Sequence, residues 1–318
     1  MDNGSFNKSR RKVKKIILNF SKTFIVGGIF YFIVRFIFDH LDELKGHPLH
    51  FNYLSLNGSI ALSLIAVFNY SLIWQFITQK VGCALSFERG IIAWFYAEIG
   101  KYIPGKMFFL GGKLYFYKQA GKSLKSVTFS FYLETICTLL GASLIFLISL
   151  LFTEINSFKS YQYYIYPLIF IFFLAIHPKV IEYVLNAGSK ILKKNQIKIQ
   201  MRYRDILIIT GFYTINFLIL GFSFYLLINS VYKIPFHDVF LSTGSFALAS
   251  VIGMMSFLTP SGLGVREGVL VLALKNILPD ALAGIISLIS RVWAFGTEFV
   301  LILIIYVYAK TRGIKFHH

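Results

Sequence analysis

Two short stretches place proline, glycine and charged residues inside strongly apolar sequence. The first, 100–106, reads GKYIPGK, and the second, 256–270, reads SFLTPSGLGVREGVL. Proline lacks a backbone N–H group and glycine tolerates left-handed backbone, so both stretches predict a break between two helices. The N–H groups at the start of a helix carry partial positive charge and attract anions. With the neighbouring Lys and Arg side chains, the breaks predict a binding site for an anionic group.

The candidate binding residues all come from these two stretches. They are Lys101, Pro104, Gly105, Lys106, Pro260, Gly262, Gly264, Arg266 and Glu267. Charged residues beside a break at membrane depth serve a function more often than not. The alternative for Arg266 and Glu267 is a loop pair that only caps a helix. The alternative for the lysines is anchoring at the cytoplasmic surface.

Three more charged residues, Glu134, Arg291 and Glu298, lie inside long apolar runs. One interpretation is structural ion pairing between helices, and a Glu134–Arg291 pair would join two repeats. The other is that a glutamate meets a cationic headgroup or carries a coupling proton. We therefore treat these three residues as candidates for ion pairing or coupling.

Composition predicts a protein embedded in a membrane. Of 318 residues, 56% are hydrophobic and only 14% are charged, whereas soluble domains carry about 25% charged residues. Apolar runs recur that are long enough to cross a ~30 Å hydrocarbon core as helices. We expect an all-α, polytopic integral membrane protein with about six long transmembrane helices and up to eight crossings. The predicted long spans are 22–38, 53–76, 127–152, 163–176, 206–229 and 281–308.

Two regions predict helical hairpins rather than simple spans. Each arm of 90–117 would be only about 18–20 Å long, and the second arm of 239–278 about 20 Å. Pro104 and Pro260 occupy corresponding places, so the single domain 1–318 is expected to hold two halves, 1–152 and 163–308. Inverted repeats with broken helices are a recurring design of transporters. Full crossing by 239–257 stays open as an alternative.

The net charge of +18 resides mainly in loops. Lys and Arg concentrate at the N-terminus, in 80–125, in 179–204 and in the C-terminal tail, which the positive-inside rule places in the cytoplasm. We expect a multi-pass protein of the cytoplasmic (inner) membrane with both termini cytoplasmic. Membrane lipids with anionic phosphate headgroups are the expected partners, in preference to nucleic acid. No metal motif or soluble catalytic domain is evident, so we expect neither a cofactor nor an enzymatic activity.

The stretches GKYIPGK (100–106) and TPSGLGVREG (259–268) resemble the two hallmark stretches of the lysylphosphatidylglycerol synthase/flippase transmembrane family. The resemblance extends over nearly the whole chain. It implies a membrane domain that, in bifunctional members, flips aminoacylated phosphatidylglycerol made by an attached synthase domain. The family motif implicates Pro104, Gly105, Lys106, Pro260, Gly262, Gly264, Arg266 and Glu267. Two departures are Ser261, where the family commonly has glycine, and the end of the chain at His318 without an aminoacyl-transfer domain.

The leading hypothesis is a flippase for a phospholipid or for a lipid-linked headgroup such as a glycolipid or polyprenyl phosphate. One alternative is an intramembrane transferase that uses a lipid-phosphate donor, which would act in detergent where no leaflets exist. The other alternative is a membrane scaffold of cell-envelope assembly that transports nothing.

Overall fold

The computed structural model describes residues 51–102, 107–153, 162–183, 201–256, 262 and 264–314. The predicted span 22–38 and four tip residues lie outside these ranges: Pro104, Gly105, Lys106 and Pro260. Throughout the described ranges, every regular element is a helix. The prediction of an all-α, multi-pass membrane protein is confirmed.

Four helices are long: α3 (Tyr53–Val81), α6 (Leu124–Phe152), α10 (Tyr203–Val231) and α13 (Asp280–Thr311). The remaining elements are α4 (Phe87–Glu98), η1 (Ile99–Tyr102), α5 (Met107–Gln119), α8 (Gln162–Ala175), η2 (Phe236–Asp238), α11 (Val239–Met255) and α12 (Val265–Leu274). The order long helix, two short helices, long helix therefore occurs twice, as α3–α4–α5–α6 and as α10–α11–α12–α13.

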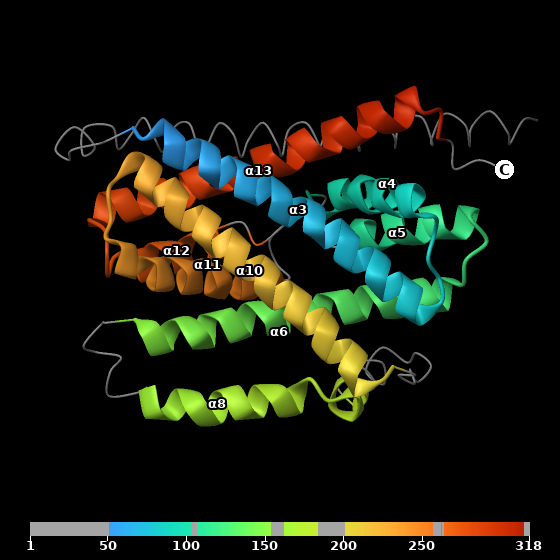
Figure 1. The fold of residues 1–318 in the computed structure, drawn as a ribbon, viewed down its shortest axis with the longest axis horizontal. Helices are drawn as coiled ribbons and strands as arrows, with labels where there is room; N and C mark the ends of the chain where they lie inside the picture. Colours follow the sequence, from blue (N-terminus) through green and yellow to red (C-terminus); the bar gives the residue numbers. More distant parts are fainter. Residues whose placement is uncertain are drawn as a thin grey trace, which may run out of the picture. The chain divides into compact units, whose positions relative to one another are not determined.

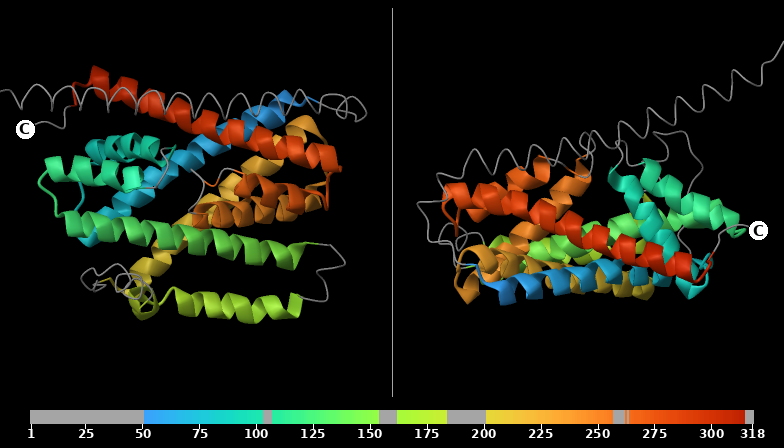
Figure 2. Two further views of the ribbon diagram at one scale, coloured as in Figure 1. Left: turned by 180° about the vertical axis from the view of Figure 1, so that it is seen from behind. Right: turned by 90° about the horizontal axis from the view of Figure 1, so that it is seen from above.

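The two sets run in opposite directions. In Figure 1, α3 and α13 run from left to right, whereas α6 and α10 run from right to left. The pair α4–α5, which we call hairpin 1, starts and ends at the right, and the pair α11–α12, hairpin 2, starts and ends at the left (Figures 1 and 2). This arrangement is what an inverted repeat requires, and the division of the chain into two halves stays a prediction that it supports.

Five described helices are long and apolar enough to cross a membrane. Four match predicted spans, and the fifth is α11 together with η2, Phe236–Met255. The predicted span 163–176 corresponds to α8, which has 14 residues and would reach only about 21 Å. Although α11 is long enough to cross, α12 packs against it and returns the chain to the end where α11 began. The second region is therefore a hairpin.

Glycines let the arms of hairpin 1 approach closely. A methyl group added at Gly112 of α5 would lie 3.0 Å from the Cα atom of Ala97 in α4. One added at Gly100 would lie 2.6 Å from the backbone carbonyl of Phe108. The contact at Gly100 leaves no room for a side chain, and the contact at Gly112 is tight enough that a methyl group would push the two arms apart by a few tenths of an ångström.

Hairpin 2 is closed in a similar way. Gly262 has a φ of +70°, and a methyl group there would lie 2.7 Å from the backbone of Gly253 in α11. Gly253 in turn faces Arg266, whose Cβ atom would lie 3.1 Å from an added methyl group. The turn of hairpin 2 therefore folds back onto α11 at Gly253.

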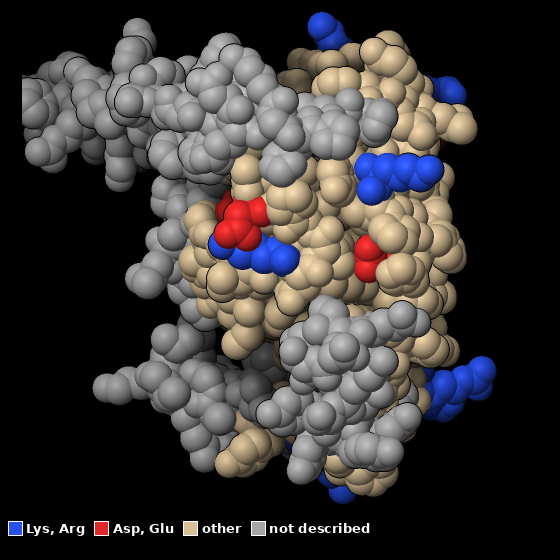
Figure 3. Space-filling view, turned by 90° about the vertical axis from the view of Figure 1, so that its left-hand side faces the viewer, with Lys and Arg blue, Asp and Glu red and all other residues tan. Residues whose placement is uncertain are grey.

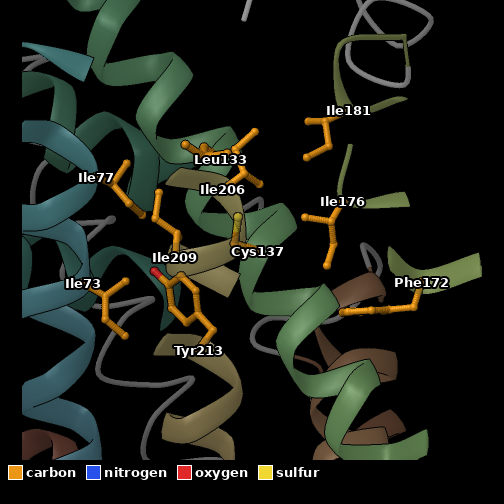
Figure 4. Packing of buried hydrophobic residues seen from close by; sticks show 10 residues of the cluster. All are labelled: Ile73, Ile77, Leu133, Cys137, Phe172, Ile176, Ile181, Ile206, Ile209 and Tyr213. Atoms are coloured by element: carbon orange, nitrogen blue, oxygen red, sulfur yellow. The ribbon is translucent and has the colours of Figure 1, made fainter. Parts of the chain in front are cut away.

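One of the hydrophobic clusters of the described residues lies between α3, α6, α8 and α10. It comprises Ile73, Ile77, Leu133, Cys137, Phe172, Ile176, Ile181, Ile206, Ile209 and Tyr213 (Figure 4).

Polar contacts join α3 to the neighbouring helices α10 and α13. The Asn216 amide of α10 donates to the Ala66 carbonyl at 3.1 Å, and the Ser63 hydroxyl lies 3.0 Å from that of Thr297 on α13. These contacts make α3, α10 and α13 the frame that holds both hairpins.

The Gly112→Ala substitution tests the close packing of hairpin 1. Because the added methyl group meets Ala97, we expect a loss of about 1–3 kcal/mol of stability, measured by thermal unfolding in detergent. The matched control is Gly111→Ala, where nothing lies within 4 Å of the added atom. Alanine favours the helix by up to ~1 kcal/mol at such a position, so an equal loss in both variants would contradict the packing.

Candidate functional site

Helix α13 presents opposite charges to the two hairpins. Arg291 and Glu298 lie about two turns apart on one face of the helix, roughly 10 Å along its axis. The Arg291 Nη1 atom lies 3.4 Å from Glu267 Oε1 of hairpin 2. Glu298 Oε1 lies 2.7 Å from the Nζ atom of Lys101, in the η1 turn that ends the first arm of hairpin 1. A single helix face therefore contacts both hairpins through ion pairs of opposite polarity.

Lys101 is shared between two carboxylates. Its Nζ atom lies 2.9 Å from Glu98 Oε2 as well as 2.7 Å from Glu298 Oε1. Glu98 belongs to the same hairpin and precedes Lys101 by three residues, whereas Glu298 belongs to α13. Both carboxylates are buried, and the Lys101 side chain is 32% exposed. The ammonium group therefore holds the first hairpin against α13 while also neutralising charge within the hairpin.

Glu267 has two roles in hairpin 2. Its Oε2 atom accepts the Gly264 N–H at 2.7 Å, which caps the start of α12, while Oε1 faces Arg291. The Ser287 hydroxyl of α13 also donates to the Glu267 backbone carbonyl at 3.1 Å. Helix capping, the simpler interpretation from the sequence, is present, and the same side chain also bonds the hairpin to α13.

Arg266 is buried beside this contact. Its guanidinium carbon lies 5.0 Å from the centre of the Phe246 ring of α11, and Phe246 packs edge-on against Trp293 of α13, with 6.0 Å between ring centroids. A guanidinium group above an aromatic ring is stabilised by the ring's negative face. Arg266 therefore lies between the arms of hairpin 2 and next to α13.

The structure contains a buried charge that the sequence analysis missed. Lys113 of α5 is fully buried, pairs with Glu134 of α6, and lies 3.8 Å from the centre of the Trp74 ring of α3. The rings of Phe109 (4.5 Å), Trp94 (5.7 Å) and Phe131 (5.8 Å) also surround its ammonium group. The Trp94 indole donates to Glu134 Oε1 at 3.1 Å. We call this group of residues the lysine cage.

The signal for the lysine cage was available in the sequence. Lys113 stands in the middle of the short apolar arm GGKLYFY, where a charge must be neutralised if the arm enters the membrane. Lys113 was treated only as one of the basic residues of 80–125, so no partner was predicted for it. The cage joins hairpin 1 to α3 and α6.

The predicted Glu134–Arg291 pair is wrong. Glu134 pairs with Lys113, and Arg291 pairs with Glu267. Each long helix that follows a hairpin packs against that hairpin, so Glu134 of α6 finds its partner in hairpin 1 and Arg291 of α13 finds its partner in hairpin 2. The ion pair that links hairpin 1 to α13 is Lys101–Glu298 instead.

The interior charges of the described residues balance in sign. The cations are Lys101, Lys113, Arg266 and Arg291, and the anions are Glu98, Glu134, Glu267 and Glu298. Ion pairs buried in a low-dielectric medium are sensitive to loss of one partner, which leaves an uncompensated charge. An arriving anion or cation therefore has to compete with an existing pair.

Removing one partner of the lysine cage tests its importance for folding. Because Glu134→Gln leaves the Lys113 ammonium without its carboxylate, we expect a loss of about 3–5 kcal/mol of stability. The double variant Lys113→Met/Glu134→Gln should recover much of this loss. Lys275→Ala is the control, since it breaks an exposed pair with Asp280 worth less than about 1 kcal/mol. Equal unfolding temperatures for the single and control variants would contradict the account.

The sequence of the chain matches the model of a known protein family. The model that describes the lysylphosphatidylglycerol synthase TM region matches residues 24–303, which include both hairpins, the lysine cage and the ion pairs of α13. Among curated proteins, no relative matches the sequence. The match extends over most of the chain and agrees with the resemblance of the two hairpin motifs. The chain belongs to the lysylphosphatidylglycerol synthase TM-region family, and it is a multi-pass membrane protein with a lipid-related function.

Proposed function

We propose that the protein is a flippase that moves a phospholipid, or a lipid-linked headgroup such as a glycolipid or polyprenyl phosphate, across the cytoplasmic membrane. The observation that carries this proposal is the meeting of two oppositely directed hairpins at one charged face of α13. Broken helices and charged side chains at membrane depth are features of substrate paths through transporters.

The headgroup phosphate would engage hairpin 2. Arg266 and Arg291 both lie at its contact with α13, and guanidinium groups bind phosphate through paired hydrogen bonds. A phosphate reaching Arg291 would compete with Glu267, whose contact with it is 3.4 Å long. Displacing Glu267 would break its contact with Arg291 and so loosen hairpin 2 from α13. Phosphate binding and the opening of hairpin 2 would therefore occur together. Pro104, Gly105, Lys106 and Pro260 are proposed to complete the headgroup path, and Gly262 and Gly264 to shape it.

The distribution of charge supports an orientation for this path. One end of the helix set carries Lys80, Arg89, Lys118, Lys122, Lys125, Arg202, Arg204, Lys310 and Arg312. The opposite end has Lys233 and Lys275 with Asp238 and Asp280, and the part of this face that Figure 3 draws in colour shows acidic as well as basic atoms. Positive residues favour the cytoplasmic side. We therefore propose that hairpin 1 enters from the cytoplasm and hairpin 2 from the opposite side.

A lipid translocation assay tests the proposal. The full chain is reconstituted in liposomes that contain fluorescent phosphatidylglycerol, and the loss of fluorescence on adding dithionite reports lipid that reaches the outer leaflet. We expect Arg266→Ala to lower the translocation rate by roughly 10- to 150-fold, since one charge-assisted hydrogen bond contributes roughly 1.5–3 kcal/mol. Arg266→Lys should retain part of the rate because it keeps the charge.

The control is Arg312→Ala, which removes an exposed arginine at the end of α13. All variants are first compared by thermal unfolding, so that a misfolded variant is recognised. Equal rates for the wild type and Arg266→Ala would refute the proposed site. A wild-type rate no faster than that of empty liposomes, with phosphatidylglycerol, glycolipid and polyprenyl-phosphate probes alike, would refute the flippase.

A further inference from the structure

We propose that Trp293 and Ser59 bind the hydroxyl groups of the lipid headgroup, and that the substrate is therefore a lipid whose phosphate carries a glycerol or a sugar. The inference rests on the proposed function and deepens it, because it names the part of the headgroup that these two residues recognise. Its first test measures lipid binding in detergent, so its outcome does not depend on transport.

Two buried polar atoms of α13 and α3 lack a hydrogen-bond partner among the described residues. They are Nε1 of Trp293 and Oγ of Ser59. Trp293 is 7% exposed, and Ser59 is fully buried. An unsatisfied buried polar group costs free energy, and no water inside a bilayer is available to satisfy it. A transporter that keeps two such groups has hydrogen-bonding capacity to offer to a substrate.

The two atoms belong to one region of the contact between α3 and α13. The Ser63 hydroxyl of α3 lies 3.0 Å from the Thr297 hydroxyl of α13. Ser59 precedes Ser63 by four residues, and Trp293 precedes Thr297 by four, which is about one helical turn on the same helix face in each case. Because α3 and α13 run in the same direction (Figure 1), Ser59 and Trp293 lie on the same side of this contact.

Trp293 also adjoins the proposed phosphate site. Its ring packs edge-on against that of Phe246, with 6.0 Å between the centroids, and the guanidinium carbon of Arg266 lies 5.0 Å from the centre of the same Phe246 ring. The indole and the guanidinium group are therefore both in contact with one aromatic ring. A phosphate bound by Arg266 would place the group that is esterified to it near the indole N–H.

The hydrogen-bonding capacity of the two side chains selects the headgroup. An indole N–H group only donates, whereas a serine hydroxyl both donates and accepts. A glycerol or sugar hydroxyl can accept from the indole and exchange a hydrogen bond with the serine. An ammonium group has donors only, so the amine of phosphatidylethanolamine cannot accept from the indole. A site that is built to bind a hydroxyl group therefore discriminates against such a lipid.

The burial of both atoms indicates how a headgroup would reach them. In the orientation proposed above, a headgroup from the cytoplasmic leaflet would pass along α13 from the C-terminal end of the helix. Before Trp293 it would meet the contact between Tyr306 and Tyr96 and the pair Glu298–Lys101. Because Tyr96 and Lys101 belong to hairpin 1, this hairpin would have to part from α13 to admit the headgroup.

Lipid binding to the full chain in detergent tests the site, measured as the rise in unfolding temperature when lipid is added. We expect phosphatidylglycerol, or a lipid whose phosphate carries a sugar, to stabilise the wild type at lower concentration than phosphatidylethanolamine does. The lipid effective at the lowest concentration identifies the headgroup. Trp293→Phe and Ser59→Ala should each raise the concentration of that lipid by roughly two- to twelvefold, the effect of losing one hydrogen bond, and leave that of phosphatidylethanolamine unchanged.

The matched control is Ser63→Ala, one turn along α3, which removes a hydroxyl that has a partner. It should lower the unfolding temperature without added lipid and leave the lipid preference unchanged. Ser59→Ala should not lower that temperature, because its Oγ atom has no hydrogen-bond partner among the described residues. A wild type without preference between the lipids, or a preference that Trp293→Phe leaves unchanged, would overturn the proposal. An equal loss with every lipid would assign Trp293 a packing role and overturn it as well.

Translocation of the same lipids in fluorescent form separates this inference from the flippase. A preference that Trp293→Phe removes from both binding and translocation would support both proposals. A preference in binding that depends on Trp293, in a protein that translocates no lipid, would support the site and refute the flippase. Translocation with a headgroup preference that Trp293→Phe does not change would overturn the site and leave the flippase intact.

Discussion

The structure depends on the requirement that a charge buried at membrane depth has an opposite charge beside it. Helix α13 meets this requirement twice on one face, through Arg291 with Glu267 and through Glu298 with Lys101. Each pair attaches one hairpin. The pairs have opposite polarity, because α13 contributes the arginine to one and the glutamate to the other.

The two hairpins are attached to the surrounding helices by different contacts. Hairpin 1 has a second attachment in the lysine cage, where Lys113 is enclosed by Glu134 and aromatic rings. Near Lys101, it is also joined to α13 through the ion pair with Glu298. Hairpin 2 is closed by contacts at Gly253 and Gly262 and is joined to α13 through Glu267. The hairpins therefore share α13 as a partner and differ in their second attachment.

The sequence predicted the elements better than their contacts. Hairpin 1 was expected over 90–117, and the structure has helices at Phe87–Glu98 and Met107–Gln119, because short apolar arms around Pro and Gly are visible locally. The Lys113–Glu134 pair was missed, and Glu134 was assigned to Arg291, because ion-pair partners depend on which helices pack together. A length criterion alone would have made α11 a span, since only its return through α12 shows the hairpin.

The central claim is that hairpin 1 moves against α13 during transport, and cross-linking tests it most directly. Tyr96 of α4 and Tyr306 of α13 are in contact, with 6.5 Å between their ring centroids. Both are replaced by cysteine in a chain whose native cysteines, Cys83 and Cys137, are alanine, and a short cleavable thiol reagent joins them. The account predicts that cross-linking lowers lipid translocation to the rate of empty liposomes and that cleavage restores it. Undiminished translocation by the fully cross-linked protein would contradict it.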